Sequence, residues 1–217
     1  MIEAVVFDLD GVLIDSESVW DRTRRSYVEQ HGGRWNERAT REMMGMSSTE
    51  WSRYLAERLG VDRPRETIAT EVAGQVGEAY REHLPLLPGA RGAVTRLAGH
   101  WPLGLASSAN RELIDLVLQL ADLDSFFAAT VSSEEVSRGK PAPDVYLLAA
   151  SRLSAQPERC AAVEDSRNGI LSAAAAAMRV VAVPNRDFPP GQEALAATDL
   201  VLGEIDELTV EAVSELG

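Results

Sequence analysis

The feature that most constrains this sequence is a set of short apolar runs, each of which stops abruptly at polar residues. The first run, AVVF at residues 4–7, shows no alternation of apolar and polar side chains, which is typical of a parallel strand buried on both faces. The later runs are PLGLA at 102–106, FAATV at 127–131, CAAV at 160–163, VVAV at 180–183 and DLVL at 199–202. Together these runs predict a parallel sheet.

Helical patterns lie between several of these runs. Residues 111–123 place Leu113, Val117 and Leu120 on one apolar stripe. Two further helices are predicted at 144–153 and 169–178. Strands that alternate with helices imply a Rossmann-like α/β fold, a parallel sheet with helices on both faces. In such folds ligands bind beyond the carboxyl ends of the strands.

One long segment interrupts the alternation. Residues 16–85 read as helix throughout, and one apolar stripe at intervals of four consists of Ile68, Val72, Val76, Tyr80 and Leu84. A chain of 217 residues is long enough for one large domain or for a domain with an insertion. We therefore predict an α/β core formed by residues 1–15 and 86–217, with an all-helical domain, residues 16–85, inserted after the first strand.

The composition limits the classes of partner. A net charge of −13 argues against non-specific binding to nucleic acid, and no apolar stretch approaches the length of a membrane span. The N-terminus carries acidic residues instead of the basic start of a signal peptide. Cys160 is the single cysteine, which excludes an internal disulfide framework and fits a reducing compartment. We expect a cytoplasmic protein, and no obligate protein partner is evident.

Two aspartates follow the first apolar run, in the stretch FDLDG. Asp8 and Asp10 stand two residues apart, so in an extended backbone their side chains point the same way. Two converging carboxylates repel each other unless a cation joins them, and carboxylates with open coordination suit Mg²⁺. A carboxylate can also attack phosphorus, with a second carboxyl nearby as general acid and base. A turn rich in Asp and Gly is the alternative interpretation.

Polar residues also follow two later runs. Ser107 lies between a predicted strand and a predicted helix, where a hydroxyl and backbone amides can hold a phosphoryl group, although serine is also a routine helix cap. Glu164 and Asp165 follow the run CAAV. This acidic pair can complete a magnesium site with Asp8, or it can simply cap the next helix.

The only lysine of the chain stands in the stretch SRGKPAPD, among 21 basic residues that are otherwise arginine. Lysine offers a compact charge on a flexible stem, whereas arginine offers a flat fork of donors. Lys140 can therefore neutralise a crowded anionic centre and tie a nucleophilic carboxylate to a phosphoryl group. Gly139, Pro141 and Pro143 would fix the loop that delivers it. Codon bias and chance are the alternative explanation.

Taken in order, the stretches FDLDGVLID, LASSAN, RGKPAPD and VEDSRNGI resemble the four motifs of the haloacid-dehalogenase superfamily. The resemblance covers essentially the whole chain, and the four motifs are jointly very specific. It implies that the helical insertion corresponds to the cap domain that this superfamily carries between its first and second motifs.

The resemblance also implies roles for individual residues. Asp8 would be the nucleophile that becomes phosphorylated, and Asp10 the general acid and base. Ser107 would bind the phosphoryl group, with Asn110 as a weaker neighbour. Lys140 would stabilise the nucleophile and the transferring phosphate.

A magnesium cofactor is implied in the same way. By resemblance, Asp165 is the main ligand from the fourth motif, and Glu164 assists directly or through water. Asp8 contributes its carboxylate, and Asp10 contributes its backbone carbonyl.

The superfamily includes several chemistries. The presence of Asp10 favours phosphoryl transfer, because the dehalogenases lack this second aspartate, and the absence of lysine from residues 16–85 argues against phosphonate cleavage through a Schiff base. Members similar to β-phosphoglucomutase usually carry an arginine where Ser48 stands and a histidine where this chain has Trp20. We therefore predict a Mg²⁺-dependent phosphatase of a small phosphorylated metabolite, with sugar or polyol phosphates as the expected class. A sugar-phosphate mutase is the alternative, and a non-catalytic binding module on the same fold is the alternative from another class.

The insertion also supplies candidates for substrate specificity, because closure of a cap over the site excludes water and presents side chains to the substrate. These candidates are Ser16, Glu17, Trp20, Met46 and Ser47, each of which also suits a packing role. The residues available to replace the missing cap arginine are Arg24, Arg25 and Arg53, which the sequence alone does not place.

Overall fold

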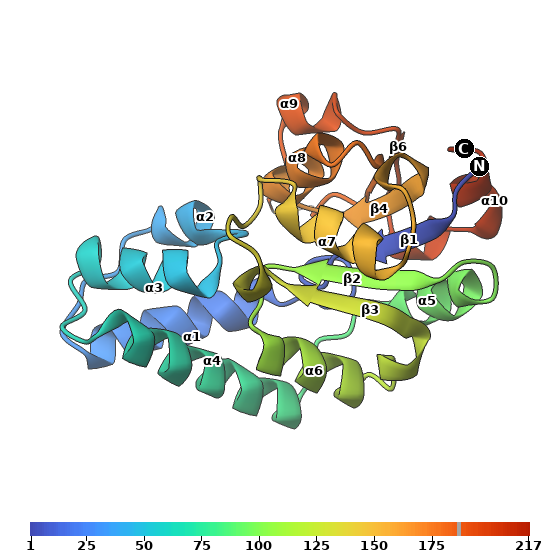
Figure 1. Cartoon of the computed structure of the whole chain (residues 1–217). Helices are drawn as coiled ribbons and strands as arrows, with labels where there is room; N and C mark the ends of the chain where they lie inside the picture. Colours follow the sequence, from blue (N-terminus) through green and yellow to red (C-terminus); the bar gives the residue numbers. More distant parts are fainter. Residues whose placement is uncertain (186–187) are drawn as a thin grey trace.

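A six-stranded sheet forms the centre of the computed structural model, which describes residues 1–185 and 188–217 (Figure 1). Its strands are β1 (Ala4–Phe7), β2 (Leu103–Ser107), β3 (Phe127–Ser132), β4 (Cys160–Glu164), β5 (Arg179–Ala182) and β6 (Leu200–Val201). Every neighbouring pair is parallel, and the strand order is β3-β2-β1-β4-β5-β6. The order reverses between β1 and β4, and in sheets of this kind a ligand crevice opens at such a reversal. The predicted α/β fold with a Rossmann-like parallel sheet is therefore confirmed.

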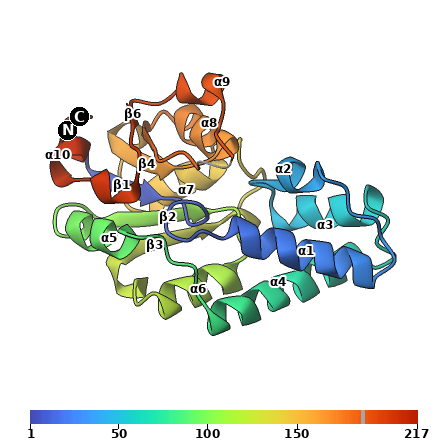
Figure 2. The same cartoon turned by 180° about the vertical axis from the view of Figure 1, so that it is seen from behind.

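Helices cover both faces of the sheet (Figures 1 and 2). The longer ones are α5 (Ala90–Ala98), α6 (Arg111–Leu120), α7 (Asp144–Arg152), α8 (Arg167–Ala175), α9 (Gln192–Leu195) and α10 (Val210–Ser214). Single 3₁₀ turns occur at Asp124–Phe126, Ser133–Glu135, Pro157–Arg159 and Ile205–Glu207. Val5 and Phe7 of β1 belong to one buried apolar cluster with α5, α6 and α10, whereas Ala4 and Val6 belong to a second cluster with α7, α8 and α9. This division follows from the alternation of side chains along a strand.

The segment between β1 and α5 forms a helical body beside the sheet (Figure 1). Its helices are α1 (Glu17–Gln30), α2 (Ala39–Met43), α3 (Ser48–Glu57) and α4 (Arg65–Glu82). The segment that enters this body and the segment that leaves it lie side by side. Ile14 forms an isolated antiparallel β-bridge with Leu86, and the backbone N–H of Asp15 donates to the carbonyl of Pro85 at 2.8 Å. The division into domains at 15/16 and 85/86 stays a prediction, and the pairing of the two connecting segments at these positions supports it.

Three details of the predicted helices are wrong. Leu120, the last residue of α6, is 39% exposed, because the buried face of the helix is formed by residues such as Ile114 and Val117. Leu84 lies beyond the end of α4, since the following Pro85 disfavours helical backbone at the residue before it. The segment 16–85 is likewise helical in pieces joined by loops, not throughout.

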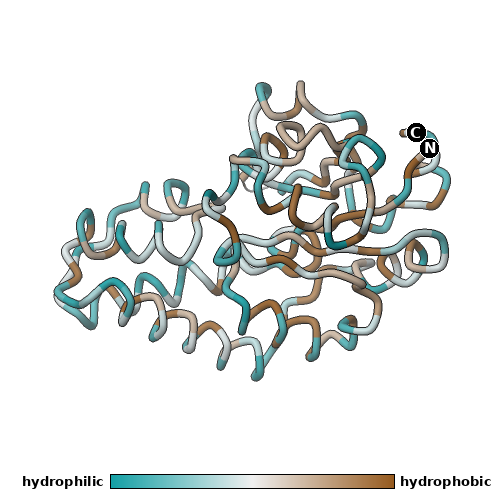
Figure 3. Tube along the Cα trace, viewed as in Figure 1, coloured by the Kyte–Doolittle hydropathy of each residue, from teal (hydrophilic) through white to brown (hydrophobic). Residues whose placement is uncertain are grey.

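Hydrophobic residues concentrate in the strands and on the helix faces beside them, whereas many of the outer turns are hydrophilic (Figure 3). In the described part of the chain, no helix combines the length and the apolar character that a membrane span requires.

Candidate active site

The loop after β1 is built around Asp8, which is 6% exposed. Its backbone N–H donates to the carbonyl of Val163 in β4 at 2.9 Å, so the residue continues the register of the sheet. The chain then turns back: Gly11 has a φ of +80° and donates its N–H to the carbonyl of Ile14 at 2.7 Å. A Cβ atom at Gly11 would lie 1.9 Å from Oδ2 of Asp165, so only glycine permits both this backbone conformation and this packing.

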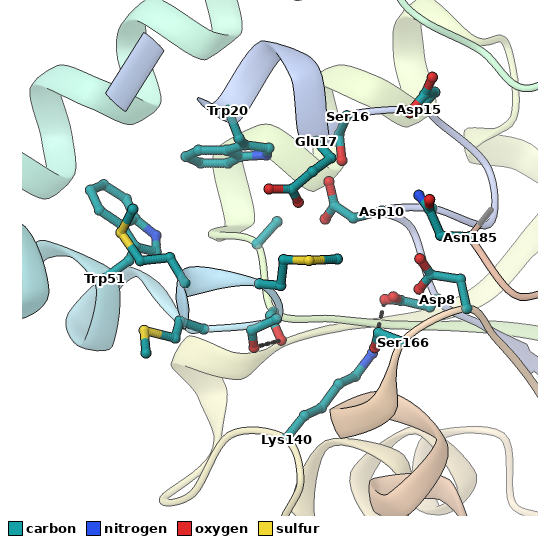
Figure 4. Close-up of a pocket in the computed structure, with 18 of the residues that line it drawn as sticks. Asp8, Asp10, Asp15, Ser16, Glu17, Trp20, Trp51, Lys140, Ser166 and Asn185 are labelled. Atoms are coloured by element: carbon teal, nitrogen blue, oxygen red, sulfur yellow. Dashed lines mark hydrogen bonds and ion pairs between the residues drawn. The ribbon is translucent and has the colours of Figure 1, made fainter. Parts of the chain in front are cut away.

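Lys140 reaches the centre of the site from the loop before α7 (Figure 4). Its Nζ lies 2.9 Å from Oδ1 of Asp8 and 2.6 Å from Oε1 of Glu164, and the residue is only 5% exposed. The contact with Asp8 is an ion pair without hydrogen-bond geometry, whereas the contact with Glu164 is a hydrogen bond. Nζ also lies 5.1 Å from the ring centre of Tyr146. The ammonium therefore sits between two carboxylates in a space closed to solvent.

Glu164, the last residue of β4, is fully buried and accepts hydrogen bonds at both oxygens. Oε1 accepts from the hydroxyl of Tyr146 at 2.7 Å as well as from the lysine, and Oε2 accepts from the backbone N–H groups of Asp165 and Ser166. Its carboxylate occupies the space where a Cβ at Gly169 would lie, at 1.8 to 2.0 Å. The stretch EDSRNG is thus folded tightly around this one carboxylate.

The acidic cluster fits a divalent cation. Ligand oxygens of Asp8, Glu164 and Asp165 lie within 4.8 Å of one another. Among the described residues, Oδ1 of Asp165 is buried without a hydrogen-bond partner, and Oδ1 of Asp8 has only its ion pair with Lys140. Burial, followed by the charge of Glu164, raises the pKa of Asp8 to about 8 although Lys140 lowers it, and burial raises the pKa of Asp165 well above its ordinary value. A hard cation would balance these charges and keep both carboxylates ionised.

Asp10 lies beside this cluster and faces the inserted helices. Its carboxyl group lies near that of Glu17, on the side of Ser16 (Figure 4). Burial raises the pKa of Asp10, while the hydroxyl of Ser16 and the charge of Lys140 lower it. A partly buried carboxyl of raised pKa beside an ionisable nucleophile can deliver a proton to a leaving group.

The LASSAN stretch divides between two locations. Ser107 is fully buried, and its Oγ accepts from the N–H of Ala109 at 3.0 Å and donates to Oδ2 of Asp10 at 3.5 Å. Asn110 precedes α6 as its N-cap, donates to Glu112 and lines a separate hollow between α4 and α6, so the structure gives no support for its predicted phosphate contact. Ser108, which the sequence did not single out, lines the cavity that contains Asp8.

A cavity of about 70 Å³ joins the acidic centre to the inserted helices. Ser16, Glu17, Trp20 and Met46, four of the predicted specificity residues, line it. Further residues that line it are Arg24, Met43, Met44, Ser48, Trp51, Ser108, Ser166 and Asn185. Most of these were missed because the faces that the inserted helices turn toward the core depend on packing, which short motifs do not record.

Ser47 is the exception among the predicted specificity residues. It does not line the cavity but precedes α3, where its hydroxyl and backbone N–H both donate to Glu50 in a capping box, at 2.7 and 2.9 Å. The neighbouring Ser48 lines the cavity instead. The insertion closes directly on the core here, since Ser108 donates its hydroxyl to the carbonyl of Gly45 at 3.2 Å.

Topology and site together define a class: a parallel α/β protein with a buried acidic centre at the carboxyl ends of β1 and β4, and a lysine held against it. A family model described as haloacid dehalogenase-like hydrolase matches residues 2–177. The chain belongs to this family of hydrolases, as its sequence motifs predict.

Curated relatives match over nearly the whole chain. The chain is 34% identical over 215 residues to hexitol phosphatase B of Escherichia coli K12, with 97% of this chain and 96% of that protein covered. It is 31% identical over 209 residues to a phosphorylated carbohydrates phosphatase of Thermotoga maritima, with 95% and 96% covered. A solved structure of β-phosphoglucomutase from Clostridium difficile superposes with a TM-score of 0.86 at 24% identity, covering 100% of this chain and 97% of that one. The last likeness shows the fold alone.

Proposed function

We propose that this protein is a Mg²⁺-dependent phosphatase that hydrolyses a small phosphorylated metabolite, a sugar or polyol phosphate, through an aspartyl-phosphate on Asp8. The observation that carries the proposal is the approach of Lys140 to Asp8 at 2.9 Å, beside a cluster of buried carboxylates. The named activities of the curated relatives support the substrate class. The single, buried cysteine fits a cytoplasmic location.

In the first step, a carboxylate oxygen of Asp8 attacks phosphorus while the bond from phosphorus to the ester oxygen breaks. Asp10 gives its proton to that departing oxygen, for which its raised pKa suits it. In the second step, water attacks the phosphorus of the aspartyl-phosphate, Asp10 takes a proton from the water, and inorganic phosphate leaves. Both residues return to their starting protonation states, so the cycle balances.

Asp8 and Asp165 would hold the magnesium ion, with the backbone carbonyl of Asp10. When bound, the ion supplies positive charge that stabilises the phosphoryl oxygens and keeps the nucleophile ionised. Glu164 already accepts hydrogen bonds at both oxygens, so we assign it the task of orienting Lys140 in preference to a direct place on the metal.

Lys140 would neutralise the phosphoryl group and Asp8 together. A guanidinium is flat and forked, and the narrow space between Asp8 and Glu164 accommodates a single charged nitrogen. This explains why a chain rich in arginine carries a lysine at this position.

The helical insertion would act as a cap that opens for the substrate. Pockets for small-molecule ligands usually have volumes of roughly 300 to 1,000 Å³, and the cavity here has only about 70 Å³. Entry of a sugar phosphate therefore requires the cap to move away from the core, and its return would exclude water from the reacting centre.

Release of inorganic phosphate from p-nitrophenyl phosphate, with Mg²⁺ and with EDTA, tests the proposal directly. We expect turnover that requires the metal and disappears in Asp8→Asn. The same preparation is then given a sugar monophosphate with a bisphosphate primer, and isomer is measured against free phosphate. Rapid isomerisation would identify a mutase instead, and failure to hydrolyse any phosphate ester would favour a binding module.

A further inference from the structure

Arg24 is a buried cation that no close ion pair holds in the part of the chain that the structure describes. It belongs to α1, lines the cavity that contains Asp8 and is 5% exposed. Within the described residues it forms no ion pair, and its Nε is buried without a hydrogen-bond partner. A buried charge without a close partner costs several kcal/mol on the order-of-magnitude scale for such groups. The charges of Glu17 and Asp10 act on Arg24 only from beyond ion-pair distance, so its unpaired donor requires an explanation.

Aromatic stacking explains only part of the environment of Arg24. Its Cζ lies 4.5 Å from the ring centre of Trp20 and 5.2 Å from that of Trp51. Contact with an aromatic ring does not use up the N–H donors of a guanidinium, which lie in the plane of the group. The two indoles therefore hold Arg24 in place and leave its Nε without a hydrogen-bond acceptor among the described residues.

Glu17 provides an acceptor beside this donor. It stands seven residues before Arg24, two helical turns away on the same face of α1, and it lines the same cavity. Its Oε1 is also buried without a hydrogen-bond partner among the described residues, and its carboxyl group lies between Trp20 and Asp10 (Figure 4). Burial raises the pKa of Glu17 to about 7, although the charge of Arg24 lowers it.

We propose that Arg24 and Glu17 form a leaving-group subsite that binds the hydroxyl groups of a neutral polyol or sugar carried on the phosphate. A hydroxyl accepts a hydrogen bond from the guanidinium and donates one to the carboxylate, so it satisfies both groups at once. A second phosphate or carboxylate on the substrate would pair with Arg24 but would be repelled by Glu17 and Asp10. The proposal rests on the proposed phosphatase function, since it assigns the substrate class of that site.

The test compares kcat/KM for three kinds of ester in the full-length protein with Mg²⁺. Sorbitol 6-phosphate and glycerol 3-phosphate carry neutral hydroxyls, 3-phosphoglycerate carries a carboxylate, and p-nitrophenyl phosphate carries neither. Arg24→Met removes the donors at similar volume, Arg24→Lys keeps the charge without the fork, and Glu17→Gln removes the carboxylate charge of the second subsite residue. The matched control is Arg25→Met. Arg25 belongs to the same helix, α1, and its guanidinium lies over the ring of Trp35, but its side chain is 49% exposed and pairs with Asp21.

For Arg24→Met we expect the ratio of kcat/KM for polyol phosphates to that for the aryl phosphate to fall roughly 10- to 100-fold, mainly through KM. Arg24→Lys and Glu17→Gln should lower this ratio by a smaller factor, and Arg25→Met should leave it unchanged. Thermal unfolding of each variant shows whether it is folded, and Glu17→Gln supplies the same test if Arg24→Met does not fold.

Three results would overturn the subsite. The first is an equal loss of polyol and aryl phosphate hydrolysis, since that would give Arg24 a purely structural role. The second is a selective loss of 3-phosphoglycerate hydrolysis, since that would indicate a site for a second anion. The third is a wild-type protein that is active but whose selectivity none of the variants changes. A wild-type protein that hydrolyses no ester would instead overturn the proposed function, and the subsite with it.

Discussion

Replacing Lys140 by methionine separates the catalytic contribution of the lysine from its structural one. The substitution removes the cation that lies 2.9 Å from Asp8 and 2.6 Å from Glu164. Loss of one partner from a buried ion pair costs about 3 to 5 kcal/mol when the other partner stays charged. For a chain of this length, that corresponds to a fall in Tm of roughly 10 °C. The loss of charge stabilisation at the transferring phosphate should lower kcat about a thousandfold, or ~4 kcal/mol.

A second substitution relieves the structural part of this loss. Glu164→Gln removes the negative charge that loss of the ammonium leaves uncompensated. The amide oxygen of the glutamine can still accept the hydrogen bond from the hydroxyl of Tyr146, which lies 2.7 Å from Oε1 of Glu164 in the wild type. The double variant Lys140→Met/Glu164→Gln should regain about 2 kcal/mol of the free energy of unfolding, because residues in one buried network couple on this scale. It should regain no activity, since Asp8 and the phosphate still lack their cation.

Urea unfolding and aryl phosphate hydrolysis, measured on the two single variants and the double variant, provide the test. Glu164→Gln alone also serves as the control for loss of the network without loss of the lysine. Recovery of activity in the double variant would show that Lys140 serves only to neutralise Glu164, and the assignment of its catalytic role would be wrong.

Three further predictions address the surroundings of the site. Tyr146→Phe removes the hydrogen bond to Glu164 and should lower the free energy of unfolding by roughly 1.5 to 3 kcal/mol, seen as a lower midpoint in urea without a change of slope. Mg²⁺ should raise Tm in the wild type and EDTA should reverse this, whereas Asp165→Asn should abolish the shift; an equal shift in that variant would place the metal elsewhere. For Glu135, burial acts to raise the pKa, but hydrogen bonds from Arg152, Ser132 and Arg111 lower it to about 2 from an ordinary value of 4.5. Because the folded pKa is the lower one, its stabilisation is present above pH 4.5 and is lost toward pH 2, so Glu135→Gln should cost about 1 kcal/mol at pH 7 and progressively less below pH 4.5.

The sheet and the centre of the site follow from local sequence patterns. Unalternated apolar runs such as AVVF identify the parallel strands, and the polar residues after them meet at one edge of the sheet. β1, β2 and β4 are buried along their whole length, whereas β3 (Phe127–Ser132) is partly exposed and neither residue of β6 (Leu200–Val201) is buried. Asp8, Glu164 and Asp165 were predicted in this way, and the structure brings their carboxylates together. Lys140 was identified because it is the only lysine of the sequence. The loop before α7 carries its side chain to Asp8.

The cap side of the cavity does not follow from local patterns. Asn110 shares a motif with Ser107, yet as the N-cap of α6 it lines a different hollow. Ser47 and Ser48 are chemically alike, and only the start of α3 decides that the first forms a capping box and the second lines the cavity. Such outcomes depend on which face a helix turns toward the core, which is set by packing with residues far away in the chain.

The two cations of the cavity differ in type for a physical reason. At the phosphoryl end, a single charged nitrogen must fit between two buried carboxylates, and the compact ammonium of Lys140 meets that condition. At the cap end, a cation must lie against two indole rings and still present several donors, and the guanidinium of Arg24 meets that condition. The lysine is conspicuous in the sequence because it is unique, whereas Arg24 is hidden among many arginines. Its burial without a close ion pair among the described residues is what distinguishes it, and that property exists only once α1, α3 and the core are packed together.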